Sequence, residues 1–385
     1  MKIQKRHFDK YASVFFVIGF VLMFITTSDV RKHYSSFMFP TGLAFVIVAS
    51  IKSFIKSFKS KCKINEFAFG VLWIVFCLSF IPSYISGNVG YALFLRYIFM
   101  YVFYIVLIGH SELDLKTLSL SMMFAGIYIA YRCFIEVGIY IVYYQGTTIN
   151  PNQFALILSG FILGCLYLLI KGNKILKVLA MLVLISCIVL LFYSSCRTVM
   201  LLVVFDILAM GLFHYKNNLH KDGEGKILID KRVFVGVSIA LCAVILVILK
   251  YFGNIYSFIF EKWGNQSSHM LSGRTDIWKE IFSGVSITGN INSTINANND
   301  FFDWLLKYGI LVFIMYCTII IYILILSIKN FKCQMDWDNL FMLLIVISYI
   351  GASFFENIHA LFGKPINVLF WCVVAMLLKK RDLRE

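Results

Sequence analysis

Long apolar runs separated by short polar segments make up most of the chain. A helix that crosses the hydrocarbon core of a bilayer needs about 20 predominantly apolar residues. The pattern therefore predicts an all-α polytopic membrane protein with about 12 transmembrane helices. The predicted spans are residues 11–27, 36–55, 66–86, 89–109, 117–140, 153–170, 175–193, 198–215, 233–252, 303–327, 339–356 and 359–378. We expect residues 1–385 to form a single integral membrane domain.

The composition excludes a soluble fold and favours contact with membrane lipids. The chain is 60% hydrophobic and only 14% charged, whereas soluble domains are about 25% charged. The net charge of +15 is also typical of nucleic-acid binding. The lysines and arginines, however, fall in short loops between the spans, where they face anionic lipid. We therefore expect no nucleic-acid partner.

The distribution of positive charge predicts the orientation of the chain. With a cytoplasmic N-terminus, the inner segments carry 24 lysines and arginines and the short outer loops carry four. This bias predicts that both termini are cytoplasmic. The first apolar run has no small-residue cleavage site and further spans follow it, so we expect a retained helix rather than a signal peptide.

Residues 253–302 form one long outer loop between the ninth and tenth spans. Loops of this length are usually functional. The loop holds "SGRTDIW" (272–278) and "NANND" (296–300). Within it, "TDIWKEIF" predicts a short amphipathic helix with Ile277, Trp278, Ile281 and Phe282 on one side.

Two arginines on the predicted outer side are candidates for binding phosphate. Arg197 stands in "SSCRTVMLL" at the outer end of a span, and Arg274 stands in the long loop. A guanidinium group matches phosphate oxygens with a planar fork of donors and stays charged. The alternatives are interfacial snorkelling for Arg197 and a solvated loop charge for Arg274.

Ionisable residues also lie inside predicted spans, where such groups line cavities or pair with one another. Arg132 and Glu136 are four residues apart and are expected to pair on one helix face. Arg96 has no local partner and is a candidate for a ligand phosphate. Asp206 is expected to bond a neighbouring helix. Separately, "NPN" (150–152) predicts a turn followed by a helix start, with Asn152 in its first turn.

Metal and cofactor sites are not predicted. The ten cysteines include no CxxC pair, and most lie in apolar runs as small hydrophobic residues. The sequence holds no phosphate-binding glycine loop, no GxSxG and no HExxH. A cytoplasmic sugar-nucleotide enzyme is therefore not supported.

Four motifs in this order resemble the O-antigen polymerase and ligase superfamily. They are "NPNQFA" opening a middle span, "SSCRT" heading a later span, "SGRTDIW" in the long loop, and "NANNDFFDWLLKYGILVFIMY" leading into the tenth span. The resemblance covers most of the chain. It implies a glycosyltransferase of the bacterial inner membrane that acts on its periplasmic face. The loop 253–302 would then cover the active site.

The resemblance also implies substrates and residue roles. The donor and acceptor are oligosaccharides linked to polyprenyl pyrophosphate, and no cofactor is needed. Arg197 and Arg274 match the family's two arginines and would hold the pyrophosphate, where negative charge develops as the bond breaks. Arg96 and Asn152 are further candidates for substrate binding. Trp278 and Trp304 would pack against sugar faces or against the loop itself.

One position departs from the family pattern. Where many members carry His-Asn, this chain carries Asn298-Asn299, and an asparagine side chain cannot act as a general base. Either Asp300 takes that role or the asparagines only orient the acceptor. The missing histidine favours a polymerase over a ligase that transfers glycan to lipid A core. A flippase is a third alternative, although no internal repeat of the kind that transporters show is present. A chain-length regulator is a conceivable partner.

Overall fold

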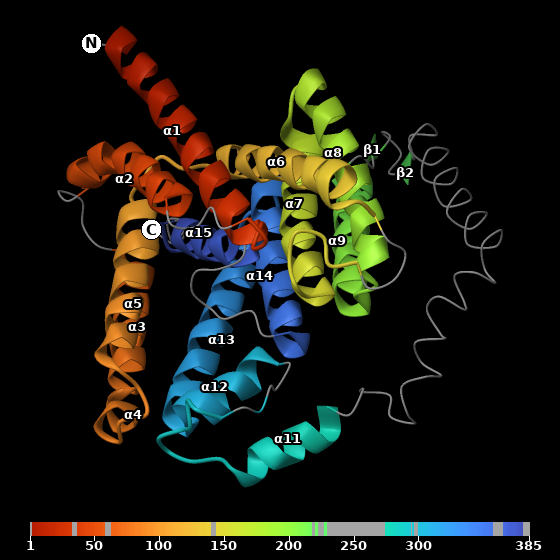
Figure 1. Ribbon diagram of the computed structural model, residues 1–385. Coiled ribbons are helices and arrows are strands. Elements are labelled where there is room, and N and C mark those ends of the chain that lie inside the picture. Colours follow the sequence, from red (N-terminus) through yellow and green to blue (C-terminus); the bar gives the residue numbers. More distant parts are fainter. Residues whose placement is uncertain are drawn as a thin grey trace. The chain divides into compact units, whose positions relative to one another are not determined.

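The computed structural model describes residues 2–32, 37–57, 63–139, 144–217, 220–221, 227–228, 274–293, 295, 299–356 and 365–379. Figure 1 shows the elements in sequence colours. They are α1 (Lys2–Ser28), α2 (Met38–Ser57), α3 (Ile64–Leu78), α4 (Ile81–Ile85), α5 (Tyr91–Met100), η1 (Tyr101–Ile108), α6 (Leu115–Tyr131), η2 (Arg132–Val137), α7 (Pro151–Lys171), α8 (Lys174–Ser194), α9 (Arg197–Asn217), β1 (His220–Lys221), β2 (Ile227–Leu228), α11 (Arg274–Ser283), α12 (Asp300–Tyr308), α13 (Ile310–Cys333), α14 (Trp337–Phe355) and α15 (Pro365–Lys379).

The described residues are almost entirely helical, which confirms the predicted all-α class. The two exceptions are β1 and β2, which pair antiparallel over two residues each. The η elements are π-helical turns that continue α5 and α6. The chain divides into two compact units. One comprises Met1–Val203 and Glu280–Glu385, and the other comprises Val204–Lys279.

Ten apolar helical segments in the described residues are long enough to cross a membrane, as expected of a multi-pass membrane protein. They correspond to ten of the twelve predicted spans. The predicted span 233–252 lies outside the described residues. The predicted span 359–378 overlaps α15, an apolar helix of only 15 residues. Nearly every side chain of α15 is buried in the protein, which explains an apolar sequence without requiring contact with lipid.

The tenth predicted span begins at the wrong residue. It was placed at 303–327, but the spanning helix α13 begins at Ile310. Residues Asp300–Tyr308 form the separate helix α12, and Gly309 with φ of +89° breaks the chain between the two helices. A left-handed φ disfavours helix continuation. The apolar residues of α12 contact other helices instead of lipid, so hydropathy alone merged the two elements.

Short polar side chains cap the helices that position the candidate site. In each case an Asp or Asn oxygen accepts a hydrogen bond from a backbone N–H of the first turn, where no helical carbonyl is available. The capping residues are Asp114 for α6, Asn150 for α7, Asn173 for α8, Asn299 for α12 and Asp336 for α14. The predicted helix start at "NPN" is confirmed, with Pro151 in the first turn of α7.

Contacts between helix termini define two ends of the first unit. At one, which we call the lysine end, Lys379 Nζ donates to Ser111 O over 2.7 Å and Lys171 Nζ lies 3.4 Å from Asp338 Oδ1. At the other, the polar end, the ends of α1, η2, α8 and α14 meet the starts of α7 and α9. From the distribution of positive charge, we expect the lysine end to face the cytoplasm and the polar end to face outward. Which side each end faces remains a prediction.

Candidate functional site at the polar end

The segment 144–152, which leads into α7, connects four helix ends. Thr147 Oγ1 donates to Ser28 O at the end of α1 over 2.7 Å. Tyr144 donates from its hydroxyl to Cys133 O in η2 and from its backbone N–H to Tyr193 O in α8. Asn152 Nδ2 donates to Glu356 Oε1 beside α14 over 2.7 Å. The sequence predicted a turn and a cap here, but not these long-range contacts.

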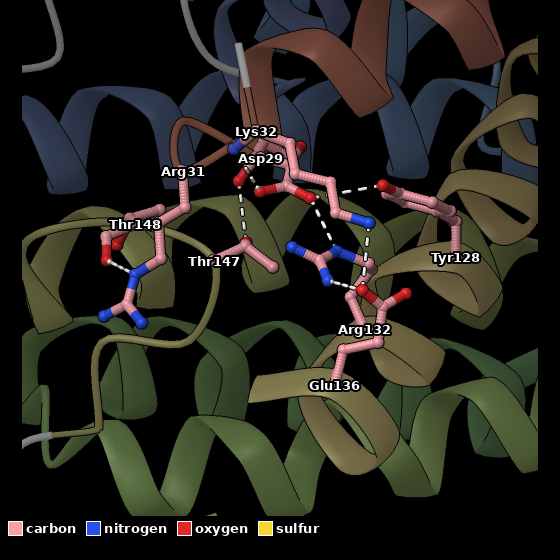
Figure 2. A network of polar contacts seen from close by, with 9 residues as sticks. Asp29, Arg31, Lys32, Tyr128, Arg132, Glu136, Thr147 and Thr148 are labelled. Carbon is pink, nitrogen blue, oxygen red and sulfur yellow. Dashed lines mark hydrogen bonds and ion pairs between the residues drawn. The ribbon is translucent and has the colours of Figure 1, made fainter. Parts of the chain in front are cut away.

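A buried charge cluster lies beside this segment (Figure 2). Arg132 Nε donates to Asp29 Oδ2 over 2.8 Å, and its Nη1 pairs with Glu136 Oε2. The side chains of Asp29 and Arg132 are 0% and 6% exposed. Tyr128 OH also donates to Asp29, and Lys32 Nζ pairs with Glu136 over 2.9 Å. The predicted Arg132–Glu136 pair is confirmed, whereas Asp29 was missed because it directly follows an apolar run.

The C-terminal end of α14 brings together two residues that the sequence nominated separately. Asn299 Nδ2 donates to Phe354 O over 2.9 Å, and Asn152 binds Glu356 two residues further along the chain. Asn299 is buried and also caps α12. Glu356 is 7% exposed. It was missed because it stood at the last position of a predicted span, although an acidic residue at such a position is a functional candidate.

Asp300 occupies a fully buried position at the start of α12. Its side chain has an exposed fraction of 0%, and its Oδ2 accepts a hydrogen bond from Tyr316 OH over 2.9 Å. The positive end of the α12 dipole also favours the charged carboxylate. The structure therefore gives Asp300 a role in fixing α12 on α13. Its catalytic assignment remains a prediction.

Arg197 begins α9 at the polar end. The turn before it contains Ser195 in a left-handed conformation, with φ of 56°. Further along, a Cβ added to Gly351 of α14 would lie 2.7 Å from Leu202 Cδ2 of α9, so Leu202 lies close to the backbone of α14 at that glycine.

Residues 286–290, which follow α11, are hydrogen-bonded to residues 306–310 at the junction of α12 and α13. Asn290 N donates to Leu306 O over 2.7 Å, and Ile310 N donates to Ser286 O over 3.1 Å. Gly289 and Gly309 both have positive φ. A Cβ added to either glycine would lie within about 2.5 Å of backbone atoms in the segment opposite. Asn88 Nδ2 also donates to Gly289 O over 2.7 Å. This paired segment comprises residues 286–290 and 306–310.

We expect Gly309→Ala to lower the unfolding temperature in detergent well below that of Gly87→Ala. Both glycines have positive φ, so each substitution introduces backbone strain of about 1–2 kcal/mol. At Gly309 the new Cβ also meets Ile287 O at 2.1 Å, whereas Gly87 has nothing within 4 Å. The difference between the two variants measures the backbone clash. Equal shifts would contradict the close contact.

The aromatic side chains of α12 pack inside the protein. Trp304 is 3% exposed and stacks on Tyr316, with ring centroids 4.5 Å apart and planes at 6°. Its ring also contacts rings of α3, α5 and α12, so packing against sugars or against the loop stays a prediction. Burial and nearby Asp303 raise the pKa of Tyr308 to about 12, and Arg96 on α5 acts in the opposite direction. Arg96, a predicted ligand of phosphate, is thus an exposed residue close to α12.

The remaining candidates are placed only in part. Arg274 is the first residue of α11, and the predicted helix over "TDIWKEIF" is confirmed. The side chain of Arg274 and all of Asn298 lie outside the described part of the chain. Trp278 is half-buried on α11. On α11, Ile281 is fully buried, whereas Phe282 is 57% exposed and its ring contacts that of Phe302.

The described residues contain no group of three or more His, Cys, Asp or Glu side chains arranged to hold a metal ion. The candidate residues described at this end carry guanidinium, amide and carboxylate groups. A scan against protein-family models finds no match, and no curated protein matches the chain. The likeness to the O-antigen polymerase and ligase superfamily accordingly rests on the four sequence motifs and their order.

Proposed function

We propose that this protein is a membrane glycosyltransferase of the O-antigen polymerase type, acting at the outer face of the bacterial inner membrane. It transfers a growing glycan from polyprenyl pyrophosphate to the end sugar of a second lipid-linked repeat unit. The observation that carries the proposal is the meeting of two motif residues, Asn152 and Asn299, at the end of α14. These residues are far apart in the sequence, and each was nominated by a different motif.

The chemistry of these groups suits the proposed reaction. As the glycosidic C1–O bond to pyrophosphate breaks, its electron pair leaves with the phosphate oxygen, and negative charge grows there. A fixed guanidinium stabilises that charge without rearrangement. The leaving group is already a pyrophosphate, so the donor needs no nucleotide. Asn152 and Asn299 offer amide groups for positioning sugar hydroxyls.

Two loop features support an acceptor site at the polar end rather than a transport pathway. The paired segment 286–290 and 306–310 fixes part of the long loop on the α12–α13 junction, and Trp304 anchors α12 among buried aromatic rings. A positioned loop suits a reaction in which two substrates must be aligned. The Asn-Asn pair in place of His-Asn favours polymerase over ligase.

Purified protein in proteoliposomes, supplied with a lipid-linked repeat unit, tests the proposal. A polymerase converts labelled repeat units into a ladder of longer glycans on a gel, with no added nucleotide. A ligase leaves the ladder absent and transfers glycan only when lipid A core is supplied. A flippase moves the substrate across the bilayer without changing its length. Either of the last two results would overturn the assignment.

A further inference from the structure

We propose that Arg96 on α5 binds the pyrophosphate of the polyprenyl carrier at the outer surface of the helix bundle. This inference rests on the proposed function and deepens it, because it names the place where the lipid-linked substrate binds on arrival from the bilayer. Arg96 is exposed and lies in the apolar segment Tyr91–Ile108. Among the residues that the structure describes, none forms a hydrogen bond or an ion pair with it.

The depth of Arg96 determines which partners it can reach. A guanidinium group in an apolar helix is costly unless it is paired or solvated. Helix α5 begins at Tyr91, and Arg96 lies five residues further, which is about 7.5 Å along the helix axis. From this depth a long side chain reaches the level of the lipid head groups. Water and phosphate are the partners available there, and phosphate oxygens match the planar fork of guanidinium donors.

The helix surface next to Arg96 suits a long hydrocarbon chain. Leu95 and Phe99 are exposed and four residues apart, so they lie on one side of the helix. Val102, at the start of η1, is exposed as well. These residues continue from the level of Arg96 toward the lysine end. A polyprenyl pyrophosphate joins an anionic head to a long apolar tail, so each of its parts finds a surface of matching chemistry here.

Arg96 also lies close to the paired segment of the long loop. Helix α4 and the turn after it hold this segment, because Ser83 Oγ donates to Tyr308 O over 2.9 Å and Asn88 Nδ2 donates to Gly289 O over 2.7 Å. Arg96 is near enough to Tyr308 to oppose the rise in the pKa of its hydroxyl. A carrier bound at Arg96 would therefore hold its sugars beside α12 and the paired segment. An ordinary phospholipid has no such sugars, and we assign the site to the carrier.

The role of Arg96 is binding, whereas stabilisation of the leaving pyrophosphate is assigned to Arg197. The two arginines lie on different helices, α5 and α9. A residue that holds the substrate equally in the ground state and in the transition state changes KM and leaves kcat unaltered. The expected kinetic signature of Arg96 therefore differs from that of Arg197.

The first test measures binding without turnover. Purified protein in detergent is titrated with undecaprenyl pyrophosphate, with uncharged undecaprenol and with phosphatidylglycerol, and binding is followed by native mass spectrometry. We expect Arg96→Gln to lower the affinity for the pyrophosphate about 10-fold, the loss of a charge-assisted hydrogen bond. Undecaprenol should bind the variant and the wild type equally. Arg31→Gln removes another exposed arginine, whose Nε donates to Thr148 O, and should leave every affinity unchanged.

A photoreactive side chain in place of Leu95 gives a second measurement, which does not depend on the folding of Arg96→Gln. We expect it to cross-link to undecaprenyl pyrophosphate in proteoliposomes, and an excess of unlabelled pyrophosphate should suppress the cross-link. The control position is Ile175 on α8, which is exposed and apolar as well. Equal cross-linking at Leu95 and Ile175 would indicate contact with bulk lipid and would contradict the proposal.

The outcomes separate this inference from the proposed function. An unchanged affinity in Arg96→Gln overturns the role of Arg96, and so does phosphatidylglycerol that competes as well as the pyrophosphate, since the site is then a general phospholipid site. In proteoliposomes, Arg96→Gln should raise KM for the repeat unit about 10-fold at unchanged kcat, and a fall in kcat alone contradicts a binding role. A wild-type protein that binds the carrier through Arg96 but makes no glycan ladder overturns only the proposed function.

Discussion

Arg197→Ala should lower the rate of glycan lengthening about 100- to 1,000-fold, the effect of removing one fixed donor to a developing negative charge. The residue begins α9 at the polar end. Arg197→Lys should recover little of the rate, because an ammonium group cannot replace the planar two-pronged donor. The measurement is the initial rate of repeat-unit consumption in proteoliposomes, at matched protein content.

Arg31→Ala is the matched control for this experiment. Arg31 is also an arginine at the polar end, but its Nε donates to Thr148 O over 3.1 Å, so its role is to hold the segment 144–152. A partly exposed contact of this kind contributes about 1 kcal/mol to stability. We expect Arg31→Ala to keep most of the activity. Full-length glycan from Arg197→Ala would exclude the guanidinium from the reaction.

Asp29→Ala should destabilise the fold by about 3 kcal/mol, because it leaves the buried guanidinium of Arg132 without its main partner. Glu136 still pairs with Arg132, which limits the loss. Lys32→Ala breaks a pair whose side chains are 38% and 35% exposed, and we expect less than about 1 kcal/mol from it. The free energy of unfolding in mixed micelles, measured for both variants, checks the difference.

The double variant Asp29→Leu with Arg132→Met distinguishes a loss of charge pairing from a loss of packing. Replacing both members of a buried pair by apolar residues of similar volume is often neutral for stability. We therefore expect the double variant to be more stable than Asp29→Ala. If the two are equally unstable, the buried pair is not the cause of the loss.

The sequence was sufficient to predict features that depend on local pattern. Ten spans, the cap at Asn150, the helix over "TDIWKEIF" and the Arg132–Glu136 pair were all predicted, because each depends on residues within about one to six helical turns. It failed where a helix lies against protein rather than lipid. Thus α12 was merged with α13, and the short buried α15 was taken for a full span, because hydropathy does not distinguish the two environments.

The candidate site required contacts between residues far apart in the chain. Asn152 was nominated for its motif, but its partner Glu356 lies 204 residues away and carried no motif of its own. Asp29 was likewise 103 residues from Arg132. Single acidic residues at the margins of apolar runs are ambiguous in sequence, since snorkelling and burial give the same pattern. Only the packing of helix ends shows which of them are enclosed.

The separation between Asp29 and Arg132 also has a consequence for biogenesis. The carboxylate enters the membrane region with α1, whereas its guanidinium partner is synthesised 103 residues later. At ordinary rates of translation, this delay is about 5–20 s. During that interval, α1 depends on water or lipid head groups to solvate Asp29 at the bilayer surface. The buried pair between α1 and α6 therefore forms only once α6 has left the ribosome, although α1 can already pack against α2.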